Sequence, residues 1–168
     1  MIPYAPSGPP LLFHQTHSSS IRLSIDRRLA KRFDGTKGIC FSNRPVRVGE
    51  LIALKILETA NSRNGALRFG LACEDPESIE SEDLAQYAIP DLTCEQGYWA
   101  KGIPERLVQR GNVLGFWLSP EGEVHYGCNG NRHGVFFQGV DVKCTLWVLF
   151  DVFGSTISVS IIGENLIL

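Results

Sequence analysis

The sequence predicts an all-β protein, an antiparallel β-sandwich of two sheets in the manner of a jelly roll. Three observations favour this class. Apolar residues alternate with polar ones in short runs, turn-forming pairs separate the runs, and no segment has the spacing of a long amphipathic helix. A strand of this kind buries one face and exposes the other, so each run is expected to contribute every second side chain to a core.

In chain order, residues 1–10 are rich in proline and predict a flexible lead-in. One domain is expected over residues 11–164, followed by a tail at 165–168, and the length suits a single core. The predicted core faces are Ile39 and Phe41; Ile52, Leu54 and Ile56; Leu67, Phe69 and Leu71; Leu146, Val148, Phe150 and Val152; and Ile157, Val159 and Ile161.

Turn signals fall between these runs, at Asp34-Gly35, Asn64-Gly65, Glu121-Gly122 and Asn129-Gly130. Pro120 to Gly122 is expected to close a hairpin. Two segments do not alternate. Glu74 to Asp83 carries six carboxylates and predicts a loop with one helical turn, and Pro104 to Arg110 predicts another single turn with proline at its first position.

The composition is that of a soluble globular protein, with no apolar stretch near the roughly 20 residues that span a bilayer. The N-terminus lacks the basic start and apolar core of a secretory signal. Five scattered cysteines with no close pair indicate reduced thiols and a cytoplasmic location. No cofactor and no nucleic-acid partner is expected.

Basic residues are concentrated near the N-terminus. Residues 1–50 hold eight Lys and Arg against three Asp and Glu, a net charge of +5, whereas residues 51–168 carry −7. Either these cations keep an edge hairpin solvated and prevent edge-to-edge pairing, or they bind anionic lipid headgroups at about 1 kcal/mol for each basic residue. The candidates are Arg22, Arg27, Arg28, Lys31, Arg32 and Lys37.

No catalytic constellation is predicted, since no Ser or Cys lies in a nucleophile elbow. His125, Cys128 and His133 have the only metal-like spacing. Strand alternation, however, places His125 and Cys128 on opposite faces. Two surface histidines and one packed cysteine are therefore expected, and no metal site.

Aromatic residues supply candidate binding anchors. Tyr98 and Trp99 follow Gly97 in a loop-like context, where aromatic side chains serve as exposed anchors of interfaces. The alternative for Trp99 is a place in the core. Trp117 and Trp147 lie within strands and are expected to be core residues.

Polar residues at two turns complete the candidate peptide-binding set. Asn129, Asn131 and Arg132 could hydrogen-bond the amide side chains of a peptide, although plain turn chemistry also explains them. Arg44 precedes a proline, which favours an extended backbone and directs the side chain outward to clamp a carboxylate or a carbonyl. The local alternative is a salt bridge to Glu50.

A series of short motifs runs through nearly the whole chain, from about Leu11 to Ile162. They are Phe-His (13–14), Ala-x-Arg (30–32), Phe-Ser-x-Arg-Pro (41–45), Leu-Arg-x-Gly (67–70), Asp-Pro (75–76), Pro-Asp-Leu (90–92), Trp-Ala (99–100), and Leu-Trp with Asp-Val-Phe-Gly (146–154). Each is weak alone, but their joint order and spacing resembles the Neuralized homology repeat, the recognition module of Neuralized-type ubiquitin ligases.

The resemblance implies a β-sandwich similar in shape to SPRY and galectin-like folds, and a non-enzymatic role in choosing substrates for ubiquitination. The implied partners are the cytoplasmic tails of Delta- and Jagged-type Notch ligands and Bearded-type inhibitors, bound through Asn-x-x-Asn peptides. It also implies phosphoinositide binding, and hence a peripheral position at the plasma membrane or endosomes.

Two features depart from the family pattern. Arg63 stands where the family usually has Trp before its small-Gly step, and the chain has no C-x₂-C pair from which a RING finger could be built. Ubiquitin transfer is therefore expected to need another domain or subunit. Lipid-surface binding and sugar binding by a jelly roll remain as alternatives. The galectin-type arrangement of Trp with His, Asn and Arg cannot be assembled from the sequence.

Overall fold

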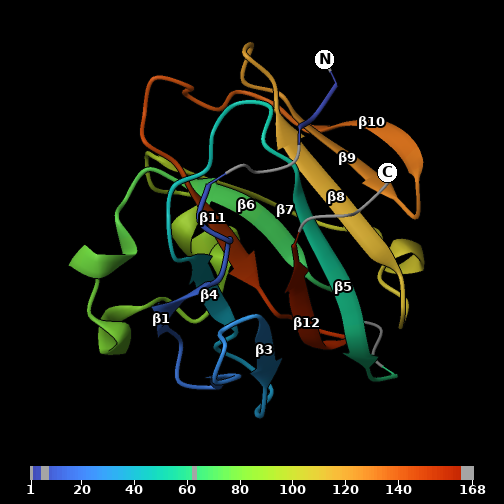
Figure 1. Ribbon diagram of the computed structural model, residues 1–168. Coiled ribbons are helices and arrows are strands. Elements are labelled where there is room, and N and C mark those ends of the chain that lie inside the picture. Colours follow the sequence, from blue (N-terminus) through green and yellow to red (C-terminus); the bar gives the residue numbers. More distant parts are fainter. Residues whose placement is uncertain (1, 5–7, 62–63, 164–168) are drawn as a thin grey trace.

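The computed structural model describes residues 2–4, 8–61 and 64–163 and forms a sandwich of two antiparallel sheets (Figure 1). The predicted tail, the end of the predicted domain at residue 164, Arg63 and part of the lead-in lie outside the described residues. The all-β prediction is confirmed. No helix in the described ranges is long and apolar enough to cross a membrane.

The first sheet has five strands in the order β1-β4-β11-β6-β7. In chain order they are β1 (Phe13–His17), β4 (Ile39–Ser42), β6 (Arg68–Ala72), β7 (Tyr98–Gly102) and β11 (Trp147–Asp151). The second sheet has seven strands in the order β10-β9-β8-β5-β12-β3-β2. They are β2 (Ile21–Leu23), β3 (Leu29–Arg32), β5 (Ile52–Thr59), β8 (Val113–Leu118), β9 (Val124–Cys128), β10 (Asn131–Phe137) and β12 (Thr156–Ile162).

Aromatic rings join the two sheets across the core. Phe69 of β6 stacks on Phe116 of β8, with ring centroids 3.8 Å apart and planes within 5°. Phe150 of β11 meets Phe69 and Phe13 edge-on, at 6.0 and 5.2 Å. All four rings are fully buried. The alternation therefore predicted the inner faces of β5, β6 and β11 correctly. It was wrong for β4, where Cys40 faces the inner core, whereas Ile39 and Phe41 belong to a second cluster on the outer face of the sheet.

The prediction that every strand exposes its second face is wrong for the centre of the five-stranded sheet, because β4 and β11 are buried on both faces. The segment between β6 and β7 folds over the outer face and covers a second apolar cluster. That cluster contains Ile39, Phe41, Ala72, Ala88, Leu92, Tyr98 and Leu149. The covering segment, at the left of Figure 1, contains the acidic stretch.

In the described part of the chain, four short helical segments interrupt the strands: η1 (Pro76–Ser78), η2 (Ser81–Asp83), η3 (Ala88–Leu92) and η4 (Glu105–Leu107). The acidic stretch therefore holds two helical turns where the sequence predicted one. The predicted turn near Pro104 is confirmed, although Pro104 caps η4 and does not begin it. The predicted hairpin at Pro120 to Gly122 joins β8 to β9.

A bulge in β12 corrects one predicted core face. The pairing of β12 with β5 shifts register between Thr156 and Val159. As a result Ile157 is only half-buried, whereas Thr156 is buried and its hydroxyl oxygen accepts a hydrogen bond from the backbone N–H of Leu67 at 2.9 Å. A bulge inserts an extra residue, so strict alternation stops there.

Candidate functional site

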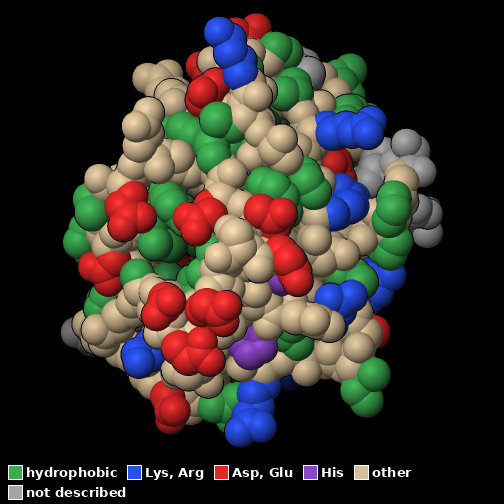
Figure 2. Space-filling model, turned by 90° about the vertical axis from the view of Figure 1, so that its left-hand side faces the viewer, with side chains coloured by type: hydrophobic (Ala, Val, Ile, Leu, Met, Phe, Trp, Pro, Cys, Tyr) green, Lys and Arg blue, Asp and Glu red, His purple; other side chains and the backbone are tan. Residues whose placement is uncertain are grey.

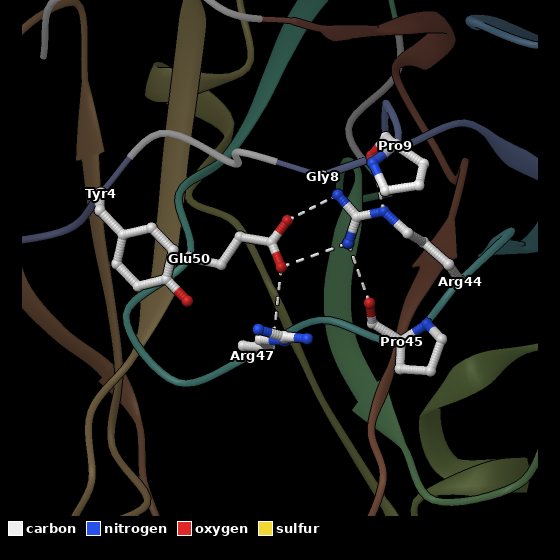
Figure 3. Close-up of a pocket in the computed structure, with 7 residues that line it drawn as sticks. All are labelled: Tyr4, Gly8, Pro9, Arg44, Pro45, Arg47 and Glu50. Carbon is white, nitrogen blue, oxygen red and sulfur yellow. Dashed lines mark hydrogen bonds and ion pairs between the residues drawn. The ribbon is translucent and has the colours of Figure 1, made fainter.

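A pocket of about 470 Å³ opens at one end of the sandwich, between the N-terminal segment and the loop that follows β4 (Figure 3). Proline and tyrosine rings, two arginines and a buried glutamate surround it. The lining residues are Tyr4, Gly8, Pro9, Arg44, Pro45, Arg47 and Glu50.

Backbone hydrogen bonds fix both walls of this pocket. Val46 pairs with Leu146 next to β11, and the N–H of Gly49 donates to Leu118 at the end of β8, at 2.8 Å. Tyr4 donates to Gly49 and accepts from Leu51, both at 2.9 Å, so the lead-in is paired with the loop at this point. A pocket with fixed walls loses little conformational entropy when it binds a ligand.

An ion pair between Arg44 and Glu50 lies at the base of the pocket. The Nη2 atom of Arg44 donates to Oε2 of Glu50 at 2.8 Å and Nη1 donates to Oε1 at 3.3 Å. The Glu50 side chain is 4% exposed and its Oε1 also accepts from the N–H of Arg47 at 3.1 Å. Nε of Arg44 donates to the carbonyl of Pro9 at 2.9 Å. The local salt bridge weighed as an alternative for Arg44 is present, so Arg44 organises the pocket.

Two polar side chains of the pocket remain exposed. Arg47 is exposed beside the buried ion pair and Tyr4 is 43% exposed. Neither residue was predicted from the sequence as part of a site. Tyr4 falls in a proline-rich stretch with no periodic pattern, and Arg47 looks like any other surface arginine. The sequence pointed to this loop through Arg44, which precedes a proline and has Glu50 close by along the chain.

Tyr98 and Trp99 lie in β7, so the predicted loop context is wrong. Tyr98 is buried in the outer cluster and its hydroxyl donates to Oε2 of Glu74 at 2.6 Å. Burial, together with the Glu74 and Glu95 carboxylates, raises the pKa of the Tyr98 phenol. Trp99 is half-buried against the inner core. Neither ring is a freely exposed anchor.

The turn between β9 and β10 follows ordinary turn chemistry. Asn129 has a positive φ of 51° and its Oδ1 accepts from the N–H of Val113 at 2.8 Å. Its Nδ2 donates to Oδ1 of Asn112 at 3.0 Å. Asn131 is exposed, and the Arg132 guanidinium lies 5.3 Å from the ring centre of Trp117.

The structure does not bring the six predicted peptide-binding residues together. Gly49 bonds to Leu118 at the C-terminal end of β8, whereas Asn129 bonds to Val113 at its N-terminal end. The Arg44 pocket and the Asn129 turn are therefore at opposite ends of β8. Tyr98 belongs to the other sheet.

Trp117 and Trp147 are buried as predicted, although neither belongs to the two apolar clusters.

His125 stacks on Trp117 with centroids 5.8 Å apart. His125 and His133 thus contact aromatic rings, the latter that of Tyr126. Within the described residues no group of His, Cys, Asp or Glu could hold a metal ion.

The basic residues near the N-terminus divide into two groups. Arg32 is buried, and its guanidinium donates to the carbonyls of Gly35, Gly154 and Thr156 at 3.1, 2.8 and 3.2 Å. Burial lowers the pKa of Arg32, against the opposing effect of Asp151. It therefore belongs to the framework. The others lie on or beside the hairpin of β2 and β3. Arg22 and Lys37 are exposed, whereas Arg27, Arg28 and Lys31 are partly buried.

Comparison with known proteins places the chain in a well-defined group. The Neuralized family model matches residues 13–163. "Protein neuralized" of Drosophila virilis is 39% identical over 159 residues, which is 94% of this chain and 21% of the fly protein. "E3 ubiquitin-protein ligase NEURL1B" of Mus musculus is 38% identical over 155 residues, 91% of this chain and 28% of the mouse protein. The chain thus spans about a fifth to a quarter of these relatives.

Solved structures give the same grouping. The crystal structure of the neuralized-nhr1 domain of Drosophila melanogaster superposes with a TM-score of 0.90 at 39% identity and covers 94% of this chain and all of that domain. The SPRY domain of human HERC1 superposes with a TM-score of 0.64 at 13% identity, covering 92% of this chain and 99% of that domain. This second likeness concerns the fold.

Proposed function

The chain belongs to the Neuralized family as a Neuralized homology repeat, a protein-interaction domain, and from this premise we propose that it recognises short Asn-x-x-Asn peptides to select substrates for a ubiquitin ligase. The proposed partners are cytoplasmic tails of Delta- and Jagged-type Notch ligands and Bearded-type inhibitors. The names of the mouse and human relatives, which are E3 ubiquitin-protein ligases, support the ligase context.

The pocket at Arg44 is the observation on which the proposed peptide site depends. It is open, its walls are held by backbone hydrogen bonds, and its two exposed polar groups are complementary to an amide. An Asn side chain offers a carbonyl acceptor and two N–H donors. The Arg47 guanidinium can donate to the carbonyl, and the Tyr4 hydroxyl can accept from the NH₂ group.

Calorimetry tests this assignment. The titrant is a peptide with blocked termini that carries Asn-x-x-Asn, and its matched control has both Asn replaced by Ala. We expect binding only for the Asn peptide. Arg47→Ala should weaken it roughly tenfold, as loss of a hydrogen bond from a charged donor does.

Asn131→Ala, at the other end of β8, is the matched control and should leave the affinity unchanged. If Asn131→Ala weakens binding and Arg47→Ala does not, the peptide site belongs to the β9–β10 turn. If no heat appears with either peptide up to millimolar concentration, the Asn-motif proposal is wrong.

The ligase context has its own test. In a ubiquitination reaction that contains a full-length relative and a Notch-ligand tail, an excess of this chain should compete for the tail and suppress its modification. Arg47→Ala should suppress less. If ubiquitination of the tail is undiminished when this chain is in saturating excess, the chain and the relative do not bind the same part of the tail.

A second candidate function is weak binding to anionic lipid surfaces. Ile25, at the tip of the β2–β3 hairpin, is fully exposed, and Phe33 at its base is 58% exposed. The Phe33 ring lies 5.1 Å from the Arg22 guanidinium and 5.5 Å from the Lys31 ammonium. Exposed apolar groups beside cations suit a membrane interface.

Co-sedimentation with vesicles tests this candidate. Binding should rise with the fraction of phosphatidylserine or phosphoinositide, fall at high salt, and decrease in Arg27→Glu/Arg28→Glu. Arg106→Glu/Arg110→Glu reverses the same charge near η4 and should have little effect. Binding that is indifferent to anionic lipid would exclude this function.

A further inference from the structure

A second concave surface lies on the outer face of the five-stranded sheet, where the segment between β6 and β7 covers it. It is a groove of about 290 Å³ whose floor is apolar and whose rim is acidic. The floor residues are Ile79, Leu84, Ala85, Leu92 and Tyr98, and the rim carboxylates belong to Glu74, Glu80, Asp83, Asp91 and Glu95. We call this surface the acidic groove.

The charge around the acidic groove is of one sign. Residues 74–95 contain eight Asp and Glu and no Lys, Arg or His, although the whole chain carries only −2. No lysine or arginine is among the described residues that line the groove. Among the described residues the one ion pair recorded for this segment joins Glu77 to His14, at 3.1 Å. Figure 2 shows acidic side chains gathered over this face, with hydrophobic side chains between them.

The acidic groove is formed before any partner arrives, because its walls are attached to the sheet. The N–H of Ala88 donates to Oδ2 of the buried Asp151 at 2.9 Å. The Tyr98 hydroxyl holds Glu74, and Asp75 caps η1 by accepting from the N–H of Glu77 at 2.9 Å. A partner therefore need not order this segment on binding.

We propose that the acidic groove docks a Lys- or Arg-bearing segment of a partner polypeptide. The aliphatic stem of a lysine or arginine packs on the apolar floor, and its head pairs with the rim carboxylates. Concentrated negative charge next to a concave apolar surface attracts cationic groups and raises their association rate. This surface goes beyond the proposed Asn-peptide site, since Arg44 lies in the loop after β4 and the groove lies on the sheet's outer face.

Backbone amide NMR of the full chain tests the proposal. The probe is a blocked peptide of alternating Lys and Val, and the controls replace every Lys by Glu or every Val by Ser. We expect saturable shifts at residues of the groove floor with the Lys-Val peptide. The Glu peptide should give none, and the Ser peptide should bind more weakly, because the floor contributes through apolar contact.

Charge and floor variants separate docking from general attraction to an acidic protein. Glu80→Gln/Asp83→Asn should weaken binding about fivefold. Asp34→Asn/Glu121→Gln removes two exposed carboxylates elsewhere and should leave it unchanged. Leu84→Ser should weaken binding about threefold at constant charge, whereas Ile25→Ser should not.

Three results would overturn the proposal: shifts spread over all acidic surfaces, equal effects of the two charge variants, or groove shifts that grow with protein concentration without peptide. The last would identify a second copy as the occupant. Titration of the Asn-x-x-Asn peptide in the same samples gives an independent result. Its failure would therefore not be mistaken for failure of the acidic groove.

Discussion

At the scale of single residues, the Arg44–Glu50 pair holds the pocket together. The carboxylate is almost fully buried and accepts from both arginine Nη atoms and from the backbone of Arg47. A buried charge needs such partners, because desolvation without them costs several kcal/mol. Arg44 also donates to the carbonyl of Pro9, which holds Pro9 at the wall of the pocket.

Arg44→Ala should therefore destabilise the fold by about 2–4 kcal/mol, because Glu50 would be left buried without its counter-charge. Urea unfolding measures the loss. Arg44→Met/Glu50→Leu removes both charges and should recover much of the stability. If the double variant is as unstable as the single one, lost packing and not the unpaired Glu50 carboxylate accounts for the loss of stability.

Asp151 is a second buried charge, on β11. Its Oδ2 accepts from Ala88 and lies 3.6 Å from Nη1 of Arg68, whose guanidinium lies 3.8 Å from the ring centre of Phe153. Burial raises the pKa of the Asp151 carboxyl despite the hydrogen bond from Ala88 and the charges of Arg68 and Arg32. The folded protein therefore holds this proton more tightly than the unfolded chain does.

The sign of the pH dependence follows from that shift. Stability from Asp151 is present in full below its ordinary pKa and is lost as the pH rises through the higher folded value. Relative to Asp151→Asn, the wild type should gain stability on acidification from neutral pH toward pH ~4. Urea midpoints across this range check it. If the wild type instead became less stable relative to Asp151→Asn on acidification, Arg68 would be lowering the pKa of Asp151 in the folded protein.

At the scale of elements, the loop that follows β11 is placed by a close approach of its backbone to Gly65. Gly154 follows β11 with φ of 60°, and a Cβ there would lie 2.1 Å from the carbonyl oxygen of Gly65. Glycine is needed at this position for both reasons. The carbonyl of Gly154 also accepts a hydrogen bond from the Arg32 guanidinium, and this bond joins the loop to β3.

Gly154→Ala should cost about 1–3 kcal/mol, from strain at the positive φ and from the displaced loop. Gly102→Ala is the matched control, because nothing lies within 4 Å of its added Cβ and Gly102 does not have a positive φ. Thermal unfolding of both variants compares them. Equal melting temperatures would contradict the close approach at Gly154.

At the scale of the whole molecule, two sheets enclose one core and offer separate surfaces at an end and on a flank. The stacked rings of Phe69 and Phe116 connect the sheets. The Arg44 pocket opens at the end of the sandwich, and the acidic groove lies on the outer face of the five-stranded sheet. The pocket and the acidic groove can bind separate partners only if the core between the two sheets stays rigid.

Phe69→Ala should lower the free energy of unfolding by about 3–5 kcal/mol, since it leaves a cavity between the sheets. Phe33→Ala, on the exposed flank of β3, should change it by less than about 0.5 kcal/mol. Urea unfolding followed by fluorescence and by circular dichroism should give coincident transitions. Separate transitions for the two probes would show that the sheets unfold independently.

The fold class, the inner faces of most strands, the hairpin turns and the family could all be predicted from the sequence. These properties depend on local alternation, turn chemistry and the order of motifs, all of which involve residues that are close together in the sequence or a fixed order along it. It also pointed to Arg44 and offered its pairing with Glu50 as an alternative.

Which surfaces are available to a partner depends on long-range packing, which the sequence pattern does not show. Arg32 and Tyr98 look like surface residues in sequence, yet long-range contacts with Gly154 and Glu74 bury or engage them. The acidic stretch was predicted as a loop with one helical turn, but packing against β4 and β11 makes it the wall of a groove. Burial depends on which distant segments meet, and that information is not present in the spacing of neighbouring residues.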